Sequence, residues 1–311
     1  MILALDSTPL SAAPGGIARY TAQLRDALRA CFPGDHVLEL TDQNASLSPL
    51  RRQWWSVGLP LALRDQRVDV FHGVDFAVPY VPVCATVMTI HDLSPWRPEF
   101  RAATSPRVRR RTPWLLKLNL VTLVITPTEA VRREVIEHFR LPPDRVCATP
   151  LGVTLAPTGE GKQDFVLAVG AGARKNLDTA RRAAEGLAPL RIVDRNVSDA
   201  ELASLYTRAR ALLMPSLYEG FGLPALEAMA CGTPVLASRD AALREVCGGA
   251  AEHIDAGDVA SWREALQALL ANPARATALT EAGLRHARAF TWERTARLTR
   301  AVYEEARRRH G

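Results

Sequence analysis

The sequence predicts an α/β protein with two domains. Its 311 residues are enough for two cores of ordinary size. Short apolar runs of strand length recur along the chain, and several lead through a glycine-containing loop into a helical pattern. Between the two halves, residues 154–163 are rich in Pro, Gly and polar residues, which is typical of a linker. We therefore expect a parallel-sheet domain on each side of this segment.

In the first half, a glycine loop at residues 11–16 follows the first apolar run and precedes a helical pattern that begins near Ile17. Thr128 stands before another helical pattern, where its hydroxyl is expected to accept a backbone N–H. Four runs predict strands: 2–6, 68–73, 85–92 and 121–126.

In the second half, Ser198 and Glu201 have the spacing of a capping box and predict the start of a helix. The end of the chain is helical in pattern. Strands are expected at 165–169, 190–193, 211–214 and 234–237, and helices at 198–206, 262–270, 275–290 and 292–309.

The segment from Pro215 to Ser238 has the order strand end, glycine loop, helix, strand. Pro224 suits the first turn of the helix, where its missing N–H has no cost. The first N–H groups of a helix lack intrahelical partners, and the helix dipole there favours anions. The segment therefore predicts a site for a phosphate-bearing, hydroxyl-rich ligand, although packing alone produces similar turns in many α/β proteins.

Two glutamates distinguish this segment from an ordinary glycine loop. Glu219 lies in the loop and Glu227 on the helix. For both to reach one ligand, the loop must fold back over the helix start. Gly220 and Gly222 make this possible, because glycine accepts positive φ and close approach.

Two further groups of polar residues follow predicted strands. His91 and Asp92 stand at the end of a strand, and ligands of open α/β sheets bind at the carboxyl ends of strands. His72 is a weaker candidate of the same kind. Arg174 and Lys175 occupy the turn before a helix, where cations can neutralise a diphosphate, or can form only a surface pair.

The net charge of +6 comes mostly from arginine, and no zinc-finger, ribonucleoprotein or helix-turn-helix pattern accompanies it. We therefore expect no nucleic-acid partner. The five cysteines are scattered and odd in number, which argues against a disulfide framework or a zinc site. The N-terminus lacks the pattern of a signal peptide. A cytoplasmic protein is expected.

The basic and apolar cluster at residues 107–119 is open to three interpretations. It could be a solvated helix face, which we favour, a surface that meets an anionic membrane, or an acceptor pocket. Pro113 is expected to interrupt any long helix here.

The segment 215–238 resembles the Glu-x7-Glu signature of the retaining glycosyltransferases of family GT4, which have the GT-B fold of two facing Rossmann-like domains. The resemblance implies that Glu219 lies against the donor sugar and that Glu227 holds the ribose of the nucleotide. The loop from Gly220 through Phe221 and Gly222 to Leu223 would contact the sugar and its phosphate.

Three other segments resemble the same family, in the same order along the chain. The resemblance implies that Gly16 approaches the donor diphosphate and that His91 contacts the sugar, with Asp92 orienting it or binding the acceptor. His72 is the weaker acceptor candidate. Arg174 and Lys175 would stabilise the departing diphosphate.

The implied organisation is an acceptor domain at residues 1–155, a donor domain at 163–290, and a helix at 291–311 that can cross back to the first domain. The implied activity is metal-independent, retaining transfer of a hexose-type sugar from a nucleotide-diphosphate sugar to a hydroxyl acceptor, without a further cofactor. Mannosyl- and rhamnosyltransferases of polysaccharide synthesis are the most similar members. A lipid-linked acceptor and peripheral contact with the inner face of the cell membrane stay open.

Two rival functions also stay open. One is a non-catalytic nucleotide-sugar or carbohydrate-binding protein, and the other an epimerase on the same fold. The first is motivated by a departure from the family pattern: almost nothing separates the strand at 190–193 from the helix at Ser198. The second domain is therefore expected to be short by about one β–α unit, where relatives contact the nucleotide base.

Overall fold

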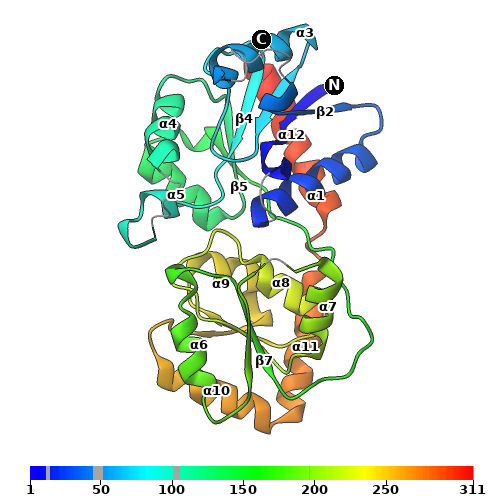
Figure 1. Cartoon of the computed structure of the whole chain (residues 1–311), viewed down its shortest axis with the longest axis vertical. Helices are drawn as coiled ribbons and strands as arrows, with labels where there is room; N and C mark the ends of the chain where they lie inside the picture. The colour runs from blue at the N-terminus through cyan, green and yellow to red at the C-terminus, as the bar shows by residue number, and fades with distance from the viewer. Residues whose placement is uncertain (12–14, 45–51, 101–105, 196, 311) are drawn as a thin grey trace. The chain divides into compact units, whose positions relative to one another are not determined.

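The structure is a computed structural model that describes residues 1–11, 15–44, 52–100, 106–195 and 197–310 (Figure 1). The chain forms two compact units. Unit 1 comprises Met1–Arg97, Arg101–Pro150 and Trp292–Gly311, and unit 2 comprises Pro98–Phe100 and Leu151–Thr291. Each unit is an α/β sandwich built on its own parallel sheet.

Unit 1 contains a six-stranded parallel sheet of order β2-β1-β3-β4-β5-β6. β1 pairs with β2 on one side and with β3 on the other. The order in which strands are added to the sheet therefore reverses between β1 and β3. In such sheets the loops at the point of reversal leave a crevice at the carboxyl ends of the strands. The strands are β1 (Ile2–Asp6), β2 (His36–Leu40), β3 (Val70–Gly73), β4 (Ala85–Thr89), β5 (Leu123–Thr126) and β6 (Val146–Ala148).

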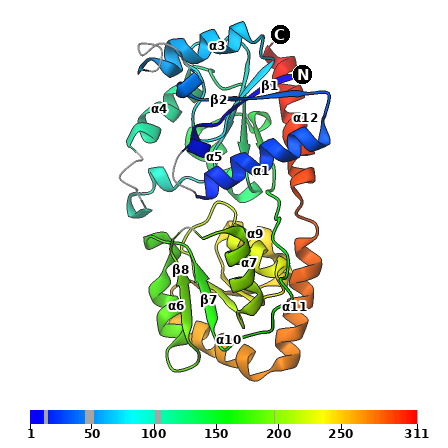
Figure 2. The same cartoon turned by 45° about the vertical axis from the view of Figure 1, so that its right-hand side comes forward.

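Helices cover both faces of this sheet (Figures 1 and 2). On one face, α1 (Gly16–Cys31) packs against α12 (Trp292–His310), and α12 also lies on β3, β4 and β5. The buried residues of α12 include Thr295, Thr299, Val302 and Tyr303, a spacing of three and four that gives one continuous helix face. The other face carries the π-helical turn η3 (Trp54–Gly58), α3 (Leu59–Asp65), α4 (Pro106–Lys117) and α5 (Glu129–Phe139).

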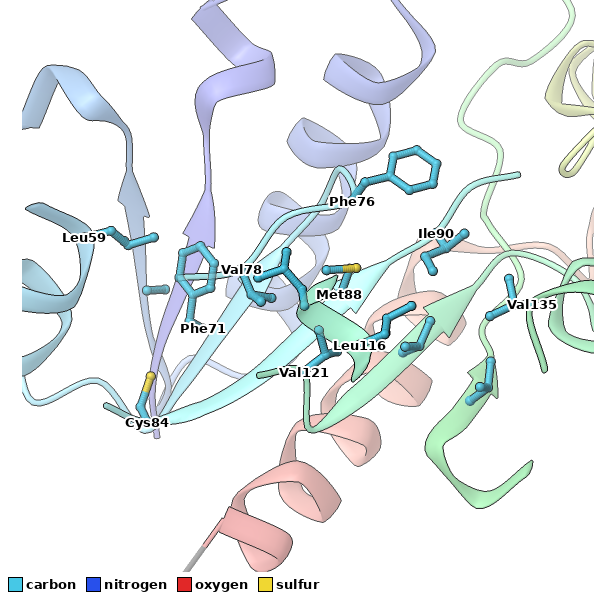
Figure 3. Close-up of a cluster of buried hydrophobic side chains, with 14 of the residues drawn as sticks. Leu59, Phe71, Phe76, Val78, Cys84, Met88, Ile90, Leu116, Val121 and Val135 are labelled. Atoms are coloured by element: carbon cyan, nitrogen blue, oxygen red, sulfur yellow. The ribbon is translucent and has the colours of Figure 1, made fainter. Parts of the chain in front are cut away.

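The core on this second face is a continuous hydrophobic cluster (Figure 3). Phe71 of β3 and Met88 of β4 are among its strand residues, while Leu59 of α3, Leu116 of α4 and Val135 of α5 are contributed by the helices. Burial of apolar side chains at about 25 cal/mol per Å² makes such a cluster the main source of stability for the unit.

Unit 2 contains a five-stranded parallel sheet of order β11-β10-β9-β7-β8. β7 pairs with β8 on one side and with β9 on the other. The order in which strands are added to this sheet therefore reverses between β7 and β9. The strands are β7 (Val166–Val169), β8 (Leu190–Val193), β9 (Leu212–Met214), β10 (Val235–Ser238) and β11 (Glu252–Ile254).

Helices also cover both faces of the second sheet. α6 (Leu177–Ala184) and α10 (Val259–Ala271) share a core cluster with the strands, in which Trp262 is fully buried. The remaining helices are α7 (Asp199–Arg208), α8 (Leu223–Ala230), α9 (Ala241–Cys247) and α11 (Pro273–Ala287). Of these, α8 packs against α7 and α11 as well as against β9 and β10.

Short 3-10 turns connect several of these elements. They are η1 (Thr8–Ser11), η2 (Asp42–Asn44), η4 (Ser94–Trp96), η5 (Pro98–Phe100), η6 (Pro143–Arg145), η7 (Ala173–Lys175) and η8 (Gly248–Ala250).

The expected helix starts are confirmed. The Thr128 hydroxyl accepts the N–H of Val131 at 3.1 Å, and Ser198 accepts that of Glu201 at 3.1 Å. Pro224 lies in the first turn of α8.

The expectation for Pro113 is wrong. α4 continues through Pro113 to Lys117. Proline removes one hydrogen bond of the helix, but Leu115 and Leu116 on the following turn are buried in the core. Burial of these two side chains offsets that loss, which the local sequence does not reveal.

The boundary between the units falls between Pro150 and Leu151, before the Pro- and Gly-rich segment. That segment is held against unit 2. Lys162 Nζ donates to the carbonyls of Ala209 and Gly232, both at 2.9 Å, and Gln163 N donates to Arg208 O at 2.8 Å. At the other boundary, α12 belongs to unit 1 by its contacts.

In unit 2, β8 ends at Val193 and α7 begins at Asp199, and the described residues between them form no further helix or strand. The short connection predicted from the sequence is thus present in the structure, while its comparison with other family members stays a prediction. Among the described residues, no helix is both long and apolar enough to span a bilayer.

Candidate functional site

In unit 2, the strand order reverses between the neighbouring parallel strands β7 and β9, and one loop follows each of them at its carboxyl end. The loop after β7 contains η7 with Arg174 and Lys175, and the loop after β9 contains Glu219. The sheet topology therefore brings together two segments that are about 40 residues apart.

The two loops are joined by a buried ion pair. Lys175 Nζ donates to Glu219 Oε1 at 2.6 Å, and only 8% of Lys175 and 5% of Glu219 are exposed. Arg174 Nη1 lies 3.6 Å from Glu219 Oε2. Both carboxylate oxygens of Glu219 thus face a cation. If either Lys175 or Glu219 is replaced, the other stays buried without this partner, which is strongly unfavourable.

Backbone and amide hydrogen bonds hold the two loops in register. Leu217 N donates to Arg174 O at 2.8 Å. The side-chain amide of Asn176 donates to Pro215 O at 3.1 Å and to Ala256 O at 2.8 Å. Asn176 has a left-handed backbone conformation, with φ 50° and ψ 43°, which asparagine tolerates better than most residues. The loop after β7, which contains Arg174 and Lys175, is therefore fixed by the loop after β9 and by the segment after β11.

Two glycines in these loops are required by the backbone. Gly170 has φ +120°, and a Cβ atom there would lie 2.6 Å from Cε of Lys175. Gly222 has φ +99°, and its Cβ would lie 2.4 Å from Cδ2 of the buried Leu243. Any other residue would be strained at both positions and would displace the site side chains.

α8 begins directly after Gly222 and presents its N-terminus at the same edge of the sheet. Among the described residues, the N–H groups of Phe221, Gly222 and Leu223 have no hydrogen-bond acceptor. Gly220 precedes them and is buried. Unpaired N–H groups at a helix start attract an anion, so this loop is suited to a phosphate.

Glu227, on the second turn of α8, is buried with 4% exposure and accepts a hydrogen bond from the Tyr206 hydroxyl at 3.1 Å. Tyr206 of α7 thus orients the side chain of Glu227 in the ligand-free protein. A carboxylate fixed in this way can accept hydrogen bonds from hydroxyl groups.

Asp240 adds a carboxylate that the sequence analysis missed. It follows β10 and caps α9, accepting the N–H groups of Ala242 at 3.0 Å and Leu243 at 3.2 Å. The backbone N–H of Glu219 also bonds to it. Burial raises the pKa of Asp240 to about 6, with a smaller contribution from the charge of Glu219. A single Asp before a helix is an ordinary cap in sequence, so only the fold reveals its place beside Glu219.

In unit 1, the candidate residues also follow strands near a reversal point, here between β1 and β3. Gly16 is the first residue of α1, after β1. A Cβ atom added at Gly16 would meet no atom of the described residues within 4 Å.

His91 follows β4 and is half-buried. Its Nε2 lies 2.8 Å from Val74 O. Because a carbonyl oxygen only accepts, Nε2 carries the proton, and in the neutral ring Nδ1 keeps its lone pair. Among the described residues, no protein atom bonds to Nδ1. Nδ1 can therefore accept a hydrogen bond from a ligand hydroxyl.

Asp92 and His72 are engaged within unit 1. Asp92 Oδ1 accepts the N–H of Ser94 at 2.8 Å and closes the turn after β4. His72 is 1% exposed, and its Nδ1 and Nε2 lie 2.7 Å from the hydroxyls of Tyr303 and Thr89. Both ring nitrogens of His72 are used internally, which argues against direct contact with an acceptor.

The structure thus brings Arg174, Lys175 and Glu219 together at one edge of the unit 2 sheet, with the start of α8 following the same loop. Gly16 and His91 follow strands β1 and β4 of unit 1. Among the described residues, no group of three or more His, Cys, Asp and Glu side chains is arranged to hold a metal ion.

Two α/β units, each built on a parallel sheet, form the architecture of GT-B glycosyltransferases. Solved structures with this fold superimpose over nearly the whole chain. Sucrose-phosphate synthase from Thermosynechococcus elongatus has a TM-score of 0.74 and 19% identity, with 98% of each chain covered. WaaG, a glycosyltransferase involved in lipopolysaccharide biosynthesis, has a TM-score of 0.64 and 14% identity, with 99% of this chain and 98% of WaaG covered.

Sequence comparison identifies the family. Residues 35–156 match the family model described as Glycosyltransferase Family 4, and residues 166–286 match Glycosyl transferases group 1. The O-antigen chain mannosyltransferase B of Escherichia coli is 32% identical over 82% of this chain and 77% of its own length. The MMP alpha-(1->4)-mannosyltransferase of Mycolicibacterium hassiacum is 42% identical over 39% of this chain and 30% of its own length.

The chain belongs to glycosyltransferase family 4. It is a nucleotide-sugar-dependent glycosyltransferase that acts in glycoconjugate synthesis.

Proposed function

We propose that the protein transfers a hexose-type sugar from a nucleotide-diphosphate donor to a hydroxyl acceptor, with retention of anomeric configuration and without a metal ion or other cofactor. The observation that carries this proposal is the contact of Lys175 and Arg174 with Glu219, in a loop that leads into the start of α8. Cations and unpaired N–H groups in one place suit a diphosphate, and the adjacent carboxylate suits a sugar.

Glu219 contacts the donor sugar in this proposal, and the diphosphate takes over the cations. In the ligand-free pair, Glu219 neutralises Lys175. When a donor binds, the negative diphosphate replaces part of that interaction. The bond from the anomeric carbon to the diphosphate oxygen then breaks, and its electron pair stays on that oxygen. The acceptor hydroxyl oxygen forms the new bond to carbon and passes its proton to the departing diphosphate. Fixed positive groups aimed at the departing diphosphate stabilise this step.

The remaining donor contacts are assigned to residues whose positions the fold already fixes. Glu227, oriented by Tyr206, accepts from the ribose hydroxyls. Phe221, Gly222 and Leu223 supply N–H groups to the phosphate. In unit 1, Gly16 approaches the diphosphate, and His91 accepts a hydrogen bond from a sugar hydroxyl through Nδ1.

A thermal-shift screen with UDP, GDP, TDP and ADP tests the donor site, because a ligand that binds only the folded state raises its stability. Donors of the stabilising nucleotide are then assayed for transfer and hydrolysis with a broad set of acceptors, including mannosyl and rhamnosyl glycans. We expect turnover and an α-configured product from an α-configured donor. An inverted product contradicts retention, and tight nucleotide binding without any turnover indicates the non-catalytic function.

The acceptor is proposed to be a growing glycan on a lipid, reached from the cytoplasmic face of a membrane. Support comes from α4, where Trp114 is 46% exposed and where Arg107, Arg110 and Lys117 are exposed as well. Leu118, directly after the helix, is 51% exposed. The helix has no acidic residue. An exposed aromatic and basic surface of this kind can bind anionic headgroups.

Co-sedimentation with vesicles tests this surface. We expect binding to vesicles with 30 mol% phosphatidylglycerol, loss of binding with pure phosphatidylcholine, and weaker binding after Arg110→Glu or Trp114→Ala. The matched control is Arg64→Glu, an exposed arginine of α3. Equal binding to both kinds of vesicle, or an equal effect of the control, would contradict membrane contact through α4.

A further inference from the structure

A chain of four buried side chains crosses unit 1 from its C-terminal helix to the neighbourhood of His91. Tyr303 Oη of α12 lies 2.7 Å from His72 Nδ1, and His72 Nε2 lies 2.7 Å from Thr89 Oγ1. Thr89 Oγ1 in turn lies 3.1 Å from Tyr20 Oη of α1. All four residues are at most 3% exposed. Polar groups so deep in a core are retained at a cost unless they are fully bonded.

This network ends on the ring of His91. The rings of Tyr20 and His91 meet edge to face, with centroids 4.9 Å apart and an interplanar angle of 85°. Thr89 also acts through its backbone, because its carbonyl accepts the N–H of Phe76 at 3.2 Å. The ring of Phe76 also lies near that of His91, with centroids 6.4 Å apart. Thr89 therefore contacts both residues whose rings pack against His91.

The tautomer of His72 decides which group donates in the hydrogen bonds of this network. Burial lowers the pKa of His72 to about 3, aided by the charge of His91, so the ring is neutral near pH 7 with one N–H and one bare nitrogen. If Tyr303 donates to His72 Nδ1, then His72 must donate to Thr89, whose own hydroxyl proton is left to donate to Tyr20. If His72 instead donates to Tyr303, Thr89 must donate to His72, and Tyr20 must donate to Thr89. Each bond thus polarises the next, and the four side chains act as a unit.

We propose that His72 and Tyr303 are positioning residues for His91. Through Thr89 and Tyr20 they hold the imidazole ring in the orientation in which Nε2–H bonds to Val74 O and Nδ1 is left for the substrate. The C-terminal helix thereby contributes to the sugar-binding side of unit 1 although none of its residues touches the substrate. The catalytic part of this inference rests on the proposed role of His91, whereas the positioning part does not.

The same helix offers a matched control. Thr299 of α12 is fully buried like Tyr303, but its hydroxyl has no hydrogen-bond partner among the described residues. Thr299→Val therefore changes a buried hydroxyl of α12 without interrupting the network. Thr89 offers a second comparison, because Thr89→Val keeps the shape of the side chain and removes the hydroxyl, whereas Thr89→Ser keeps the hydroxyl.

The test combines steady-state kinetics with nitrogen-15 NMR of the histidine rings in the full-length protein, the His91 signal being assigned with His91→Gln. We expect Tyr303→Phe and Thr89→Val to lower kcat roughly 10- to 100-fold while the donor KM stays within about three-fold. The His91 signals should move from a single tautomer with Nε2–H toward a mixture. Thr299→Val and Thr89→Ser should retain the wild-type tautomer and most of kcat.

The two readouts separate this inference from the proposed function. If Tyr303→Phe and Thr89→Val leave the His91 tautomer unchanged, or if Thr299→Val alters it equally, the positioning role is wrong. If the tautomer changes as expected but the His91→Gln variant turns over normally, His91 has no role in transfer and the proposed site is wrong, while the positioning network stands. If Thr89→Val unfolds, Tyr303→Phe against Thr299→Val still compares an interrupted network with an intact one, and if Tyr303→Phe unfolds, Thr89→Val against Thr89→Ser makes the same comparison.

Discussion

At the scale of single residues, the contact between Lys175 and Glu219 makes stability and activity inseparable in single substitutions. Removal of one partner leaves the other as a buried charge, which typically destabilises a protein by about 3–5 kcal/mol. We expect Glu219→Ala and Lys175→Ala each to lower the midpoint of urea unfolding. The double variant should recover much of that loss, because the charge that stays, on Arg174, is partly exposed to water, and yet should be at least about 100-fold less active than wild type.

Lys162 provides a control for this pair. Its ammonium is also partly buried, but it bonds to two carbonyls and the hydroxyl of Thr233 rather than to a carboxylate. Lys162→Met is expected to lower stability with little effect on kcat. An active double variant of Glu219 and Lys175 would show that the ion pair is structural only.

Asp240 gives a prediction with a defined pH dependence. Burial raises its pKa in the folded protein from 3.8 to about 6. The folded state therefore holds the proton more tightly than the unfolded chain, and ionisation destabilises the fold as the pH rises from about 4 through 6. Asp240→Asn keeps a good helix cap and should raise stability at pH 7.5, by on the order of 1 kcal/mol given the partial exposure of the side chain.

The gain from Asp240→Asn should disappear below about pH 4, where the wild-type carboxyl is protonated in both states. The control is Asp258→Asn at the start of α10. There the hydrogen bond from Ser261 lowers the pKa of the carboxyl, so this substitution should lower stability at neutral pH. Thermal unfolding at several pH values measures both. A pH-independent effect of Asp240→Asn would contradict the assigned cause.

At the scale of elements, the turn into α8 depends on Gly222. An alanine there would adopt a strained left-handed backbone and would press its Cβ against Leu243, a core residue that cannot retreat. We expect Gly222→Ala to lower stability by about 2–4 kcal/mol and to raise the donor KM, because the N–H groups at the start of α8 shift.

Gly159 is the matched control for backbone strain. It also has a positive φ, of +78°, but an added Cβ would meet none of the atoms that the structure describes within 4 Å. Gly159→Ala should therefore show only the smaller cost of a left-handed backbone, and the donor KM should not change. If the two variants behave alike, the contact with Leu243 does not determine the shape of the loop.

Sequence patterns revealed the elements whose signals are local. Fully apolar runs such as Val166–Val169 predicted buried strands, and the caps at Thr128 and Ser198 predicted helix starts. β2 and β6 were missed because they are short or mix polar with apolar residues. The path of α4 through Pro113 was also missed, since its stability comes from tertiary burial rather than from the local sequence.

The candidate site was predictable to the same extent. Arg174, Lys175 and Glu219 were expected at one ligand, and the structure places them in contact. Neither the cap role of Asp240 beside Glu219 nor the bond of His72 to Tyr303 could be predicted. The latter joins residues 231 positions apart, and no local pattern carries such a pairing.

At the scale of the whole molecule, unit 1 is discontinuous in sequence: its sheet is complete by residue 148, but one of its faces is covered by α12, from the far end of the chain. Thr295 Oγ1 bonds to Pro150 O at 2.7 Å, and Arg300 bonds to Asp35 at 2.6 Å. Unit 1 therefore cannot complete its core until α12 has been synthesised, whereas unit 2 is formed from Pro98–Phe100 and Leu151–Thr291.

This arrangement predicts an asymmetric effect of truncation after Thr291. Loss of α12 exposes the faces of β3, β4 and β5 that it covers and removes the partner of His72. We expect the truncated chain to lose amide hydrogen-exchange protection throughout the unit 1 sheet, while β7, β9 and β10 of unit 2 retain theirs. Hydrogen exchange followed by mass spectrometry distinguishes the two regions. Equal loss in both would mean that the two units fold as one cooperative structure, and protection retained in β3 and β4 would mean that α12 is not needed for the core of unit 1.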